Sequence, residues 1–418
     1  MTQSLLNRRS VLGAAYRLFY AEPLNLVRGL GVELFDADGK RYLDAYNNVP
    51  VLGHAHPAVV EAMVRQASQI NTHTRYLHDG ILTYAERLTA TFPDPLNHAM
   101  FTCSGSEAND LALRIAMTAT GGTGVIVTDN AYHGVTSLLA GMSPSLGIGT
   151  APTVRTVPPP DSYRQSSDIG AAFGAAVEAA IADMKKAGIQ PAALLVDTTF
   201  ASDGIFVEPK GHMDAAVAAI RAAGGLFIAD EVQGGFGRSG QMWTFLRHPG
   251  LIPDLVTLGK PMGNGHPIGG IVTRQDLLDI FGKKSRYFNT FGGNTVSAAV
   301  GLAVLNTIQG GNLPGHAAKV GLQLGKALCL LKRHAAVGDV RGIGFYHGIE
   351  LVTDQKSKVP ATDLAKAVTD DLARNGVLIG VCGAAANTLK IRPPLAFQPQ
   401  HVEELAEKLD DCLSRLSK

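Results

Sequence analysis

Short runs of consecutive apolar residues alternate along most of this chain with longer stretches in which apolar residues recur every three or four positions. The short runs predict strands that are buried on both faces, and the longer stretches predict amphipathic helices. The candidate strands are 125–128, 193–196, 226–229, 255–258 and 270–273, and the candidate helices include 107–118, 171–187 and 213–223. This alternation predicts an α/β fold with a mainly parallel sheet and helices on both of its faces.

The two ends of the chain and one internal stretch show different patterns. Residues 31–35 and 41–44 flank an Asp-Gly turn as half-buried strands, which predicts a β-hairpin. Beyond the breaker-rich stretch 310–315, longer amphipathic helices predominate, and the last of them is expected over 401–416. Residues 142–167 are rich in Pro, Gly and Ser, so we expect a long surface loop there.

The length and composition of the chain limit its class. A chain of 418 residues exceeds the size at which one hydrophobic core stops growing, so two domains are expected. We place a large cofactor-binding domain at 61–309 and assign 1–60 and 310–418 to a smaller α+β domain. Hydrophobic residues make up 46% and charged residues 17%, as is typical of a globular protein. The 37 basic and 36 acidic residues nearly cancel, so neither nucleic acid nor a membrane is an expected partner.

The N-terminus and the cysteines indicate the cellular compartment. Residues 7–12 superficially resemble a twin-arginine export signal, but Arg17 and Glu22 interrupt the apolar stretch that such a signal requires. No segment approaches the roughly 20 uncharged apolar residues that span a bilayer. The four cysteines are far apart and show no metal spacing, so free thiols in a reducing cytoplasm are expected. Nothing in the sequence indicates a bound metal.

Two predicted strands end next to side chains that suit one cofactor. The run 226–229 is followed by Asp230, and the run 255–258 is followed closely by Lys260. Parallel strands bring their carboxyl ends to one edge of a sheet, where open α/β sheets bind ligands. A lysine there can form a Schiff base with pyridoxal 5'-phosphate, and a carboxylate can keep the pyridine nitrogen protonated. We therefore predict a pyridoxal-phosphate enzyme; the plain alternatives are a solvated loop lysine and a capping aspartate.

A segment of small residues suits the phosphate of the same cofactor. Residues 103–109 (Cys-Ser-Gly-Ser-Glu-Ala-Asn) precede a predicted helix, and the N-terminus of a helix favours a phosphate. A plain N-cap by Ser104 or Ser106 is the alternative. Tyr132, just after the strand 125–128, is a candidate to stack on the pyridine ring. Gln233 can donate to the phenolic oxygen of the cofactor.

Five segments, taken together and in this order, resemble the class III aminotransferase family of fold-type-I pyridoxal-phosphate enzymes. They are 104–109, 132–134, 230–238, 253–260 and 290–294. The resemblance covers nearly the whole chain and implies the fold, the cofactor, and a homodimer or tetramer with shared active sites.

The resemblance implies a role for each matching position. Lys260 would bind the cofactor and move protons, and Asp230 would pair with its pyridine nitrogen. The other positions implied to bind the cofactor are Gly105, Ser106, Tyr132, His133, Val232, Gln233 and Thr290. Of these, Thr290 would reach into the site of a neighbouring subunit.

The resemblance also suggests substrate-binding residues. Arg392, in Lys-Ile-Arg-Pro-Pro-Leu, matches the arginine that grips a substrate carboxylate, a task that suits a guanidinium group. The glutamate that pairs with this arginine in some members is replaced by Ser202. The stretches containing Arg75, Tyr46 and Asn48 look like the branch that includes the amino-alcohol-phosphate phospho-lyases. Arg75 is thus a candidate anion-binding residue, or equally a member of a surface salt bridge.

Four functions compete for this sequence. We expect transamination, which moves an amino group from an amine or amino acid to a keto acid. The close alternative is a lyase that expels phosphate or ammonia from a small amino compound such as phosphoethanolamine. A non-catalytic regulator with this fold would need a basic DNA-binding module, and a dehydrogenase would need a dinucleotide fingerprint. The sequence has neither feature.

Overall fold

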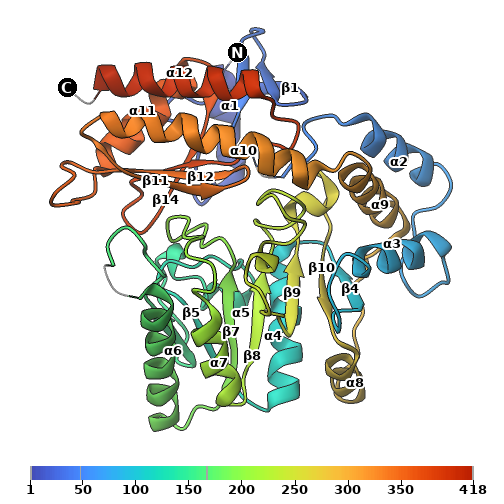
Figure 1. Cartoon of the computed structure of the whole chain (residues 1–418). Coiled ribbons are helices and arrows are strands. Elements are labelled where there is room, and N and C mark those ends of the chain that lie inside the picture. Colours follow the sequence, from blue (N-terminus) through green and yellow to red (C-terminus); the bar gives the residue numbers. More distant parts are fainter. Residues whose placement is uncertain (1, 48, 166–167, 417–418) are drawn as a thin grey trace.

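The computed structural model describes residues 2–47, 49–165 and 168–416, and a seven-stranded sheet lies at its centre (Figure 1). The strand order is β4-β10-β9-β8-β7-β5-β6. The strands are β4 (His98–Thr102), β5 (Gly124–Thr128), β6 (Val154–Val157), β7 (Pro191–Asp197), β8 (Leu226–Asp230), β9 (Leu255–Leu258) and β10 (Gly269–Thr273). Neighbours pair in parallel, except that β10 is antiparallel to both β4 and β9. The predicted α/β fold with a mainly parallel sheet is confirmed.

Two strands of this sheet were not predicted. β6 lies inside the stretch 142–167, so the expectation of one long surface loop there is wrong. Only two of the four side chains of β6 are buried, since it is an edge strand, and its apolar signal is correspondingly short. β4 begins with half-buried residues, so it also lacks a continuous apolar run.

Helices cover both faces of the large sheet. They are α4 (Gly105–Thr120), α5 (Ser137–Ala140), α6 (Ile169–Lys186), α7 (Asp214–Ala222) and α8 (Gln275–Lys284). α6 and α7 pack together over one face, while α4 and α8 pack together over the other. Successive side chains of β7 therefore enter different cores: Leu194 faces α6 and α7, and Leu195 faces α4. This burial on both faces explains the unbroken apolar runs of the central strands.

Two four-stranded sheets lie beyond the carboxyl-terminal edge of the large sheet. One joins β1 (Leu26–Leu30), β2 (Glu33–Asp36), β3 (Arg41–Asp44) and β13 (Val377–Leu378); the other joins β11 (Val337–Ile343), β12 (Tyr346–Leu351), β15 (Thr388–Ile391) and β14 (Gly380–Cys382). The predicted hairpin is formed by β2 and β3. Because β13 pairs with β3, both ends of the chain contribute to one sheet. The domain boundaries near residues 60 and 310 stay predictions.

Three helices from the C-terminal part cover these sheets: α10 (Leu313–Cys329), α11 (Thr362–Arg374) and α12 (Pro399–Leu416) (Figure 1). The apolar face expected for the last helix is buried along α12, although Leu416 at its end is 37% exposed. Contact is closest where α10 meets the turn between β11 and β12. A Cβ atom on Gly321 would lie only 2.1 Å from the carbonyl oxygen of Gly344.

Beside the edge strand β4, α2 (Pro57–Ala67) and α3 (Asp79–Thr89) each pack against α9 (Thr295–Gly310). α1 (Thr2–Arg8) lies apart from them, near the N-terminus. α9 is largely apolar, and nine of its 16 residues are buried. Within the described part of the chain, every helix is too short or too polar to cross a lipid bilayer.

Candidate active site

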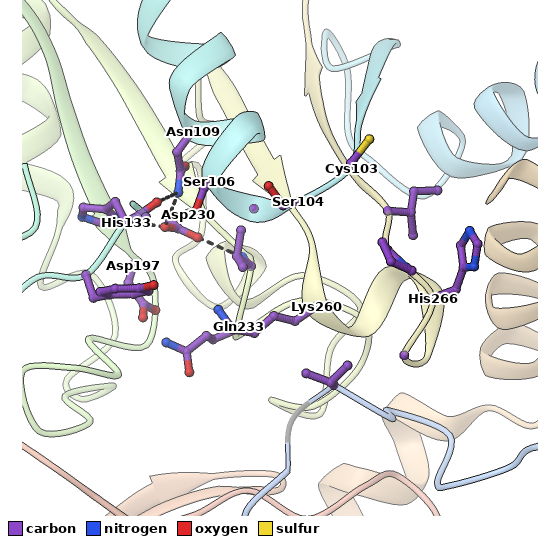
Figure 2. Close-up of a pocket in the computed structure, with 18 residues that line it drawn as sticks. Cys103, Ser104, Ser106, Asn109, His133, Asp197, Asp230, Gln233, Lys260 and His266 are labelled. Carbon is purple, nitrogen blue, oxygen red and sulfur yellow. Dashed lines mark hydrogen bonds and ion pairs between the residues drawn. The ribbon is translucent and has the colours of Figure 1, made fainter. Parts of the chain in front are cut away.

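A cavity of about 310 Å³ opens at the carboxyl-terminal edge of the large sheet (Figure 2). Asp197 ends β7, Asp230 ends β8, and Lys260 follows β9, so three neighbouring parallel strands deliver these side chains to one place. The predicted cofactor-binding residues that line it are Gly105, Ser106, Tyr132, His133, Asp230, Val232, Gln233 and Lys260. The sheet edge, the N-terminus of α4 and the loop after β5 thus form one site.

Asp230 is held as a carboxylate at the base of this cavity. Its Oδ2 accepts hydrogen bonds from His133 Nδ1 and from Asn109 Nδ2, each at 2.8 Å, and its Oδ1 accepts one from the Val232 N–H at 3.0 Å. Burial alone would raise the pKa of Asp230, but His133, Lys260 and Asn109 together lower that pKa below its ordinary value. A buried group that stays negative in this way suits a protonated pyridine nitrogen.

Burial favours the uncharged amine of Lys260. Burial lowers the pKa of Lys260 below its ordinary value, and the negative charge of Asp230 offsets only part of that effect. The backbone at Lys260 has a φ of +25°, which a lysine rarely adopts, at the first residue of a short 3₁₀ turn, Lys260–Gly263. An unprotonated lysine amine is both a nucleophile and a base.

The N-terminus of α4 combines a cap with a phosphate cradle. Ser104 Oγ accepts a hydrogen bond from the Glu107 N–H at 3.2 Å, so the plain capping interpretation of Ser104 is correct. The N–H groups of Gly105 and Ser106 follow in the first turn, beside the cavity. A Cβ on Gly105 would lie 2.7 Å from Val232 Cγ1, which accounts for glycine at this position. The residues therefore fit a group with a phosphate, a pyridine nitrogen and a carbonyl carbon that an amine can attack.

Asn109 is a functional residue to which the sequence led us to assign no role. Besides its bond to Asp230, its Nδ2 donates to the His133 carbonyl oxygen at 2.9 Å, and its Oδ1 accepts from the Thr257 hydroxyl at 2.6 Å. It is 1% exposed on the buried face of α4. A polar side chain on an otherwise apolar helix face was the signal available in the sequence.

Asp197 places a second carboxylate beside Asp230, and it too was not predicted. Its oxygens accept hydrogen bonds from the Thr199 N–H and hydroxyl, at 2.9 and 2.7 Å, and from the Ala201 N–H at 3.2 Å. Burial and the negative charge of Asp230 raise the pKa of Asp197. Like Asp230, Asp197 directly follows an apolar run, and that shared pattern could have revealed it.

Arg392 lies next to the cavity, among polar and aromatic groups. Its Nη1 donates to Gln233 Oε1 at 2.7 Å, the Tyr346 hydroxyl donates to the same oxygen at 3.1 Å, and the Tyr46 ring lies 5.1 Å from the guanidinium carbon. Among the described residues, no carboxylate forms an ion pair with Arg392, and its buried Nε has no hydrogen-bond partner.

Two other predicted residues, Thr290 and Arg75, do not line this cavity. Thr290 is exposed in the loop between α8 and α9, and its role toward a neighbouring subunit stays a prediction. Arg75 is also exposed, and its guanidinium carbon lies 3.8 Å from the centroid of the Phe288 ring. It therefore forms a cation–π contact with Phe288 in place of the salt bridge considered above. Asn48 lies outside the described residues.

Comparison with known proteins gives a consistent result. The pattern that defines class-III aminotransferases matches residues 19–413. The alanine–glyoxylate aminotransferase 2-like protein of Drosophila melanogaster is 37% identical over 430 residues, covering 99% of this chain and 87% of that protein. Ethanolamine-phosphate phospho-lyase homolog 1 of Caenorhabditis elegans is 33% identical over 438 residues, covering 99% and 94%. The solved structure of a phospholyase from Arthrobacter in complex with phosphoethanolamine has a TM-score of 0.95 and 44% identity, covering 99% and 100%.

Proposed function

The chain belongs to the class III aminotransferase family of fold-type-I enzymes, and on this premise we propose that it is a lyase that eliminates phosphate from a small amino-alcohol phosphate. Its cofactor is pyridoxal 5'-phosphate, the cofactor of the family. When bound, this cofactor stabilises the negative charge that develops on the substrate carbon next to the nitrogen. What distinguishes a lyase from an aminotransferase is the substrate that the rest of the site accepts.

The observation that carries the proposal is an excess of buried positive charge beside the cavity. Lys390 and Arg392 are two residues apart at the end of β15, so their side chains share one face, and they are only 6% and 7% exposed. Lys390 Nζ donates to the Ala201 carbonyl oxygen at 2.7 Å, and among the described residues no carboxylate pairs with it. Buried cations without counter-ions are costly, and a phosphate dianion would neutralise both.

The ionisation of Lys390 supports the same conclusion. Burial and the neighbouring charge of Arg392 lower the pKa of Lys390 to about 7. A dianion that binds beside Lys390 would favour the protonated amine and raise that pKa again. The site would thereby gain a full positive charge when the phosphate of the substrate arrives.

In this proposal, the residues of the chain act as follows. Lys260 Nζ, as the neutral amine, takes the proton from the carbon that carries the substrate nitrogen. Lys390 and Arg392 hold the phosphate, which departs from the adjacent carbon, and Asp230 keeps the pyridine nitrogen protonated. The overall reaction converts an amino-alcohol phosphate and water into an aldehyde, ammonia and inorganic phosphate. No keto acid is consumed.

Transamination, the reaction expected from the sequence, is the second candidate. Arg392 favours it, because a guanidinium group forms bidentate hydrogen bonds with the carboxylate of an amino acid or keto acid. The relative from Drosophila melanogaster is named as an aminotransferase. An enzyme whose two substrates both carry an α-carboxylate would not need the glutamate that Ser202 replaces.

A homodimer with shared active sites is part of the proposal. Thr290 is exposed on the loop where the neighbouring Phe291 is 70% exposed, and Leu77 is 97% exposed. Apolar side chains this exposed are frequent at protein–protein interfaces. We propose that this surface faces a second copy and that Thr290 completes the phosphate site of that copy.

The test is a product assay on the purified holoenzyme. Phosphoethanolamine is supplied with and without pyruvate, and inorganic phosphate, ammonia and alanine are measured. A lyase releases phosphate and ammonia in equal amounts, whether or not pyruvate is present. Alanine that forms only with pyruvate, without phosphate release, would instead establish an aminotransferase. A Lys390→Met variant should raise the KM for phosphoethanolamine, because it removes one of the two phosphate-binding cations.

A further inference from the structure

We propose that Arg392, Gln233 and Tyr346 form a hydrogen-bonded relay through which an anion bound at Arg392 changes the hydrogen bond that Gln233 offers to the cofactor. Tyr346 is a positioning residue in this relay, since it acts on the cofactor only through Gln233. The inference rests on the proposed function in taking Arg392 as the residue that receives the anion of the substrate.

The geometry fixes the orientation of the Gln233 amide. Gln233 lines the cavity, whereas Arg392 and Tyr346 lie behind it and both donate to its Oε1, at 2.7 and 3.1 Å. A guanidinium group has only donors, so the amide atom that faces Arg392 has to be the oxygen. With that oxygen fixed by two donors, the direction of the amide nitrogen is fixed as well. The two donors also polarise the amide, which makes its N–H groups stronger donors.

Arg392 is the member of the relay that a substrate can displace. Its partner Gln233 is a neutral amide, and a carboxylate or phosphate oxygen is a considerably stronger acceptor for a guanidinium group. No carboxylate in the described part of the chain competes for Arg392, and its Nε has no partner there. An arriving anion would therefore draw the guanidinium away from Gln233 Oε1.

Tyr346 is the member that stays in place. It is completely buried, and burial raises the pKa of its hydroxyl well above the ordinary value, so the hydroxyl remains a donor throughout the working pH range. After Arg392 has turned to the anion, Tyr346 still donates to Oε1 and keeps it directed away from the cofactor. The Gln233 amide keeps its orientation and becomes a weaker donor. The hydrogen bond from Gln233 to the cofactor is therefore weaker when the anion site is filled.

The relay should change the pH dependence of the visible absorption of the bound cofactor. A donor on the phenolic oxygen withdraws negative charge from the nitrogen that joins Lys260 to the cofactor, so that nitrogen loses its proton at a lower pH. A weaker donor from Gln233 therefore raises the pH midpoint of the visible absorption band. The bound anion raises this midpoint by its charge as well, and that part does not depend on the relay.

The experiment separates these two contributions. The visible absorption of the holoenzyme is titrated against pH with and without saturating inorganic phosphate, in wild type, Gln233→Leu and Tyr346→Phe. Gln233→Leu retains only the direct effect of charge and should show the smallest phosphate-induced shift. Wild type should show a larger shift. Tyr346→Phe should show the largest shift, because Oε1 of Gln233 then lacks the Tyr346 hydrogen bond as well as the one from Arg392.

Equal shifts in the three proteins, with saturable phosphate binding in each, would overturn the relay and leave the proposed function intact. The absence of any saturable response to phosphate in wild type would overturn both, because the anion site itself would be missing. Tyr346→Phe removes a single oxygen atom, and its thermal midpoint and cofactor content show whether the fold and the site are retained.

Discussion

Asp203 is a buried carboxyl group whose ionisation can be tested through the stability of the protein. Its Oδ2 accepts a hydrogen bond from the Thr128 hydroxyl at 2.7 Å, and its Oδ1 accepts one from the Asn130 N–H at 3.1 Å. Among the described residues, no cation forms an ion pair with it. Burial raises the pKa of Asp203 to about 7, against the action of these two hydrogen bonds. At a pH between these two pKa values, 3.8 and about 7, Asp203 therefore carries a proton in the folded protein and has lost it in the unfolded chain.

The difference between the folded and unfolded pKa of Asp203 determines how the stability of the protein changes with pH. A carboxyl group whose pKa is raised on folding stabilises the protein at low pH and loses that contribution as the pH rises from the unfolded to the folded pKa. The pKa is 3.8 in the unfolded chain and about 7 in the folded protein, so the loss amounts to about 4 kcal/mol at about 1.4 kcal/mol per pH unit. With about 2.1 cal/mol/K of unfolding entropy per residue over 418 residues, this corresponds to about 5 °C in the thermal midpoint.

The Asp203→Asn variant tests this reasoning. Its amide oxygen can accept from the Asn130 N–H, and its amide nitrogen can donate to the Thr128 hydroxyl oxygen, so both hydrogen bonds survive without a titrating group. We expect the variant to be more stable than wild type by only about 1 °C near about pH 4.5, and by about 5 °C near about pH 8. The control is Asp279→Asn, which removes the same charge from an exposed position on α8. A difference between Asp203→Asn and wild type that stays constant over this pH range would refute a protonated Asp203.

Four further substitutions test the cofactor site and the fold. Lys260→Ala should abolish phosphate release and the visible band of the lysine-bound cofactor; full activity in this variant would disprove the assigned chemistry. Gly105→Ala should weaken cofactor binding about tenfold or more, measured by titration of the apoenzyme, because its Cβ would lie 2.7 Å from a methyl group of the adjacent valine. Asn109→Leu should weaken cofactor binding by a similar factor, since Asp230 loses a donor; unchanged affinity would exclude this role. Gly321→Ala should cost about 1–3 kcal/mol of stability without changing cofactor affinity, as thermal and binding titrations would show, because its Cβ would lie 2.1 Å from a carbonyl oxygen.

The parts of the fold that the sequence predicted are those in which burial leaves a continuous pattern. β8 and β9 are buried on both faces, so their apolar runs and the polar residues that end them, Asp230 and Lys260, could be located directly. In the four-residue edge strand β6 only the first and last residues are buried, and no such run marks it.

The parts of the site that the sequence did not predict depend on contacts between distant segments. Asn109 meets Asp230 across 121 positions, and Tyr346 meets Gln233 across 113. Periodicity reports which face of an element is buried, but it does not report which residue from another element meets that face. The contacts of Gln233 with Arg392 and Tyr346 are therefore properties of the assembled sheets, whereas Asp197 could have been found from the apolar run that it follows.

The pairing of β3 with β13 has a consequence for the order in which the protein is made. Leu43 and Asp44 of β3 pair with Val377 and Leu378 of β13, so each residue of β3 is synthesised 334 residues before its partner. At about 5–20 residues per second, translation of that interval takes roughly 15–70 s. During this time the whole seven-stranded sheet is synthesised, and the β3 edge of the N-terminal hairpin remains unpaired. Closure of that edge by the C-terminal segment is thus a late event, and a nascent chain released before residue 377 would expose a ready-made strand edge to aggregation.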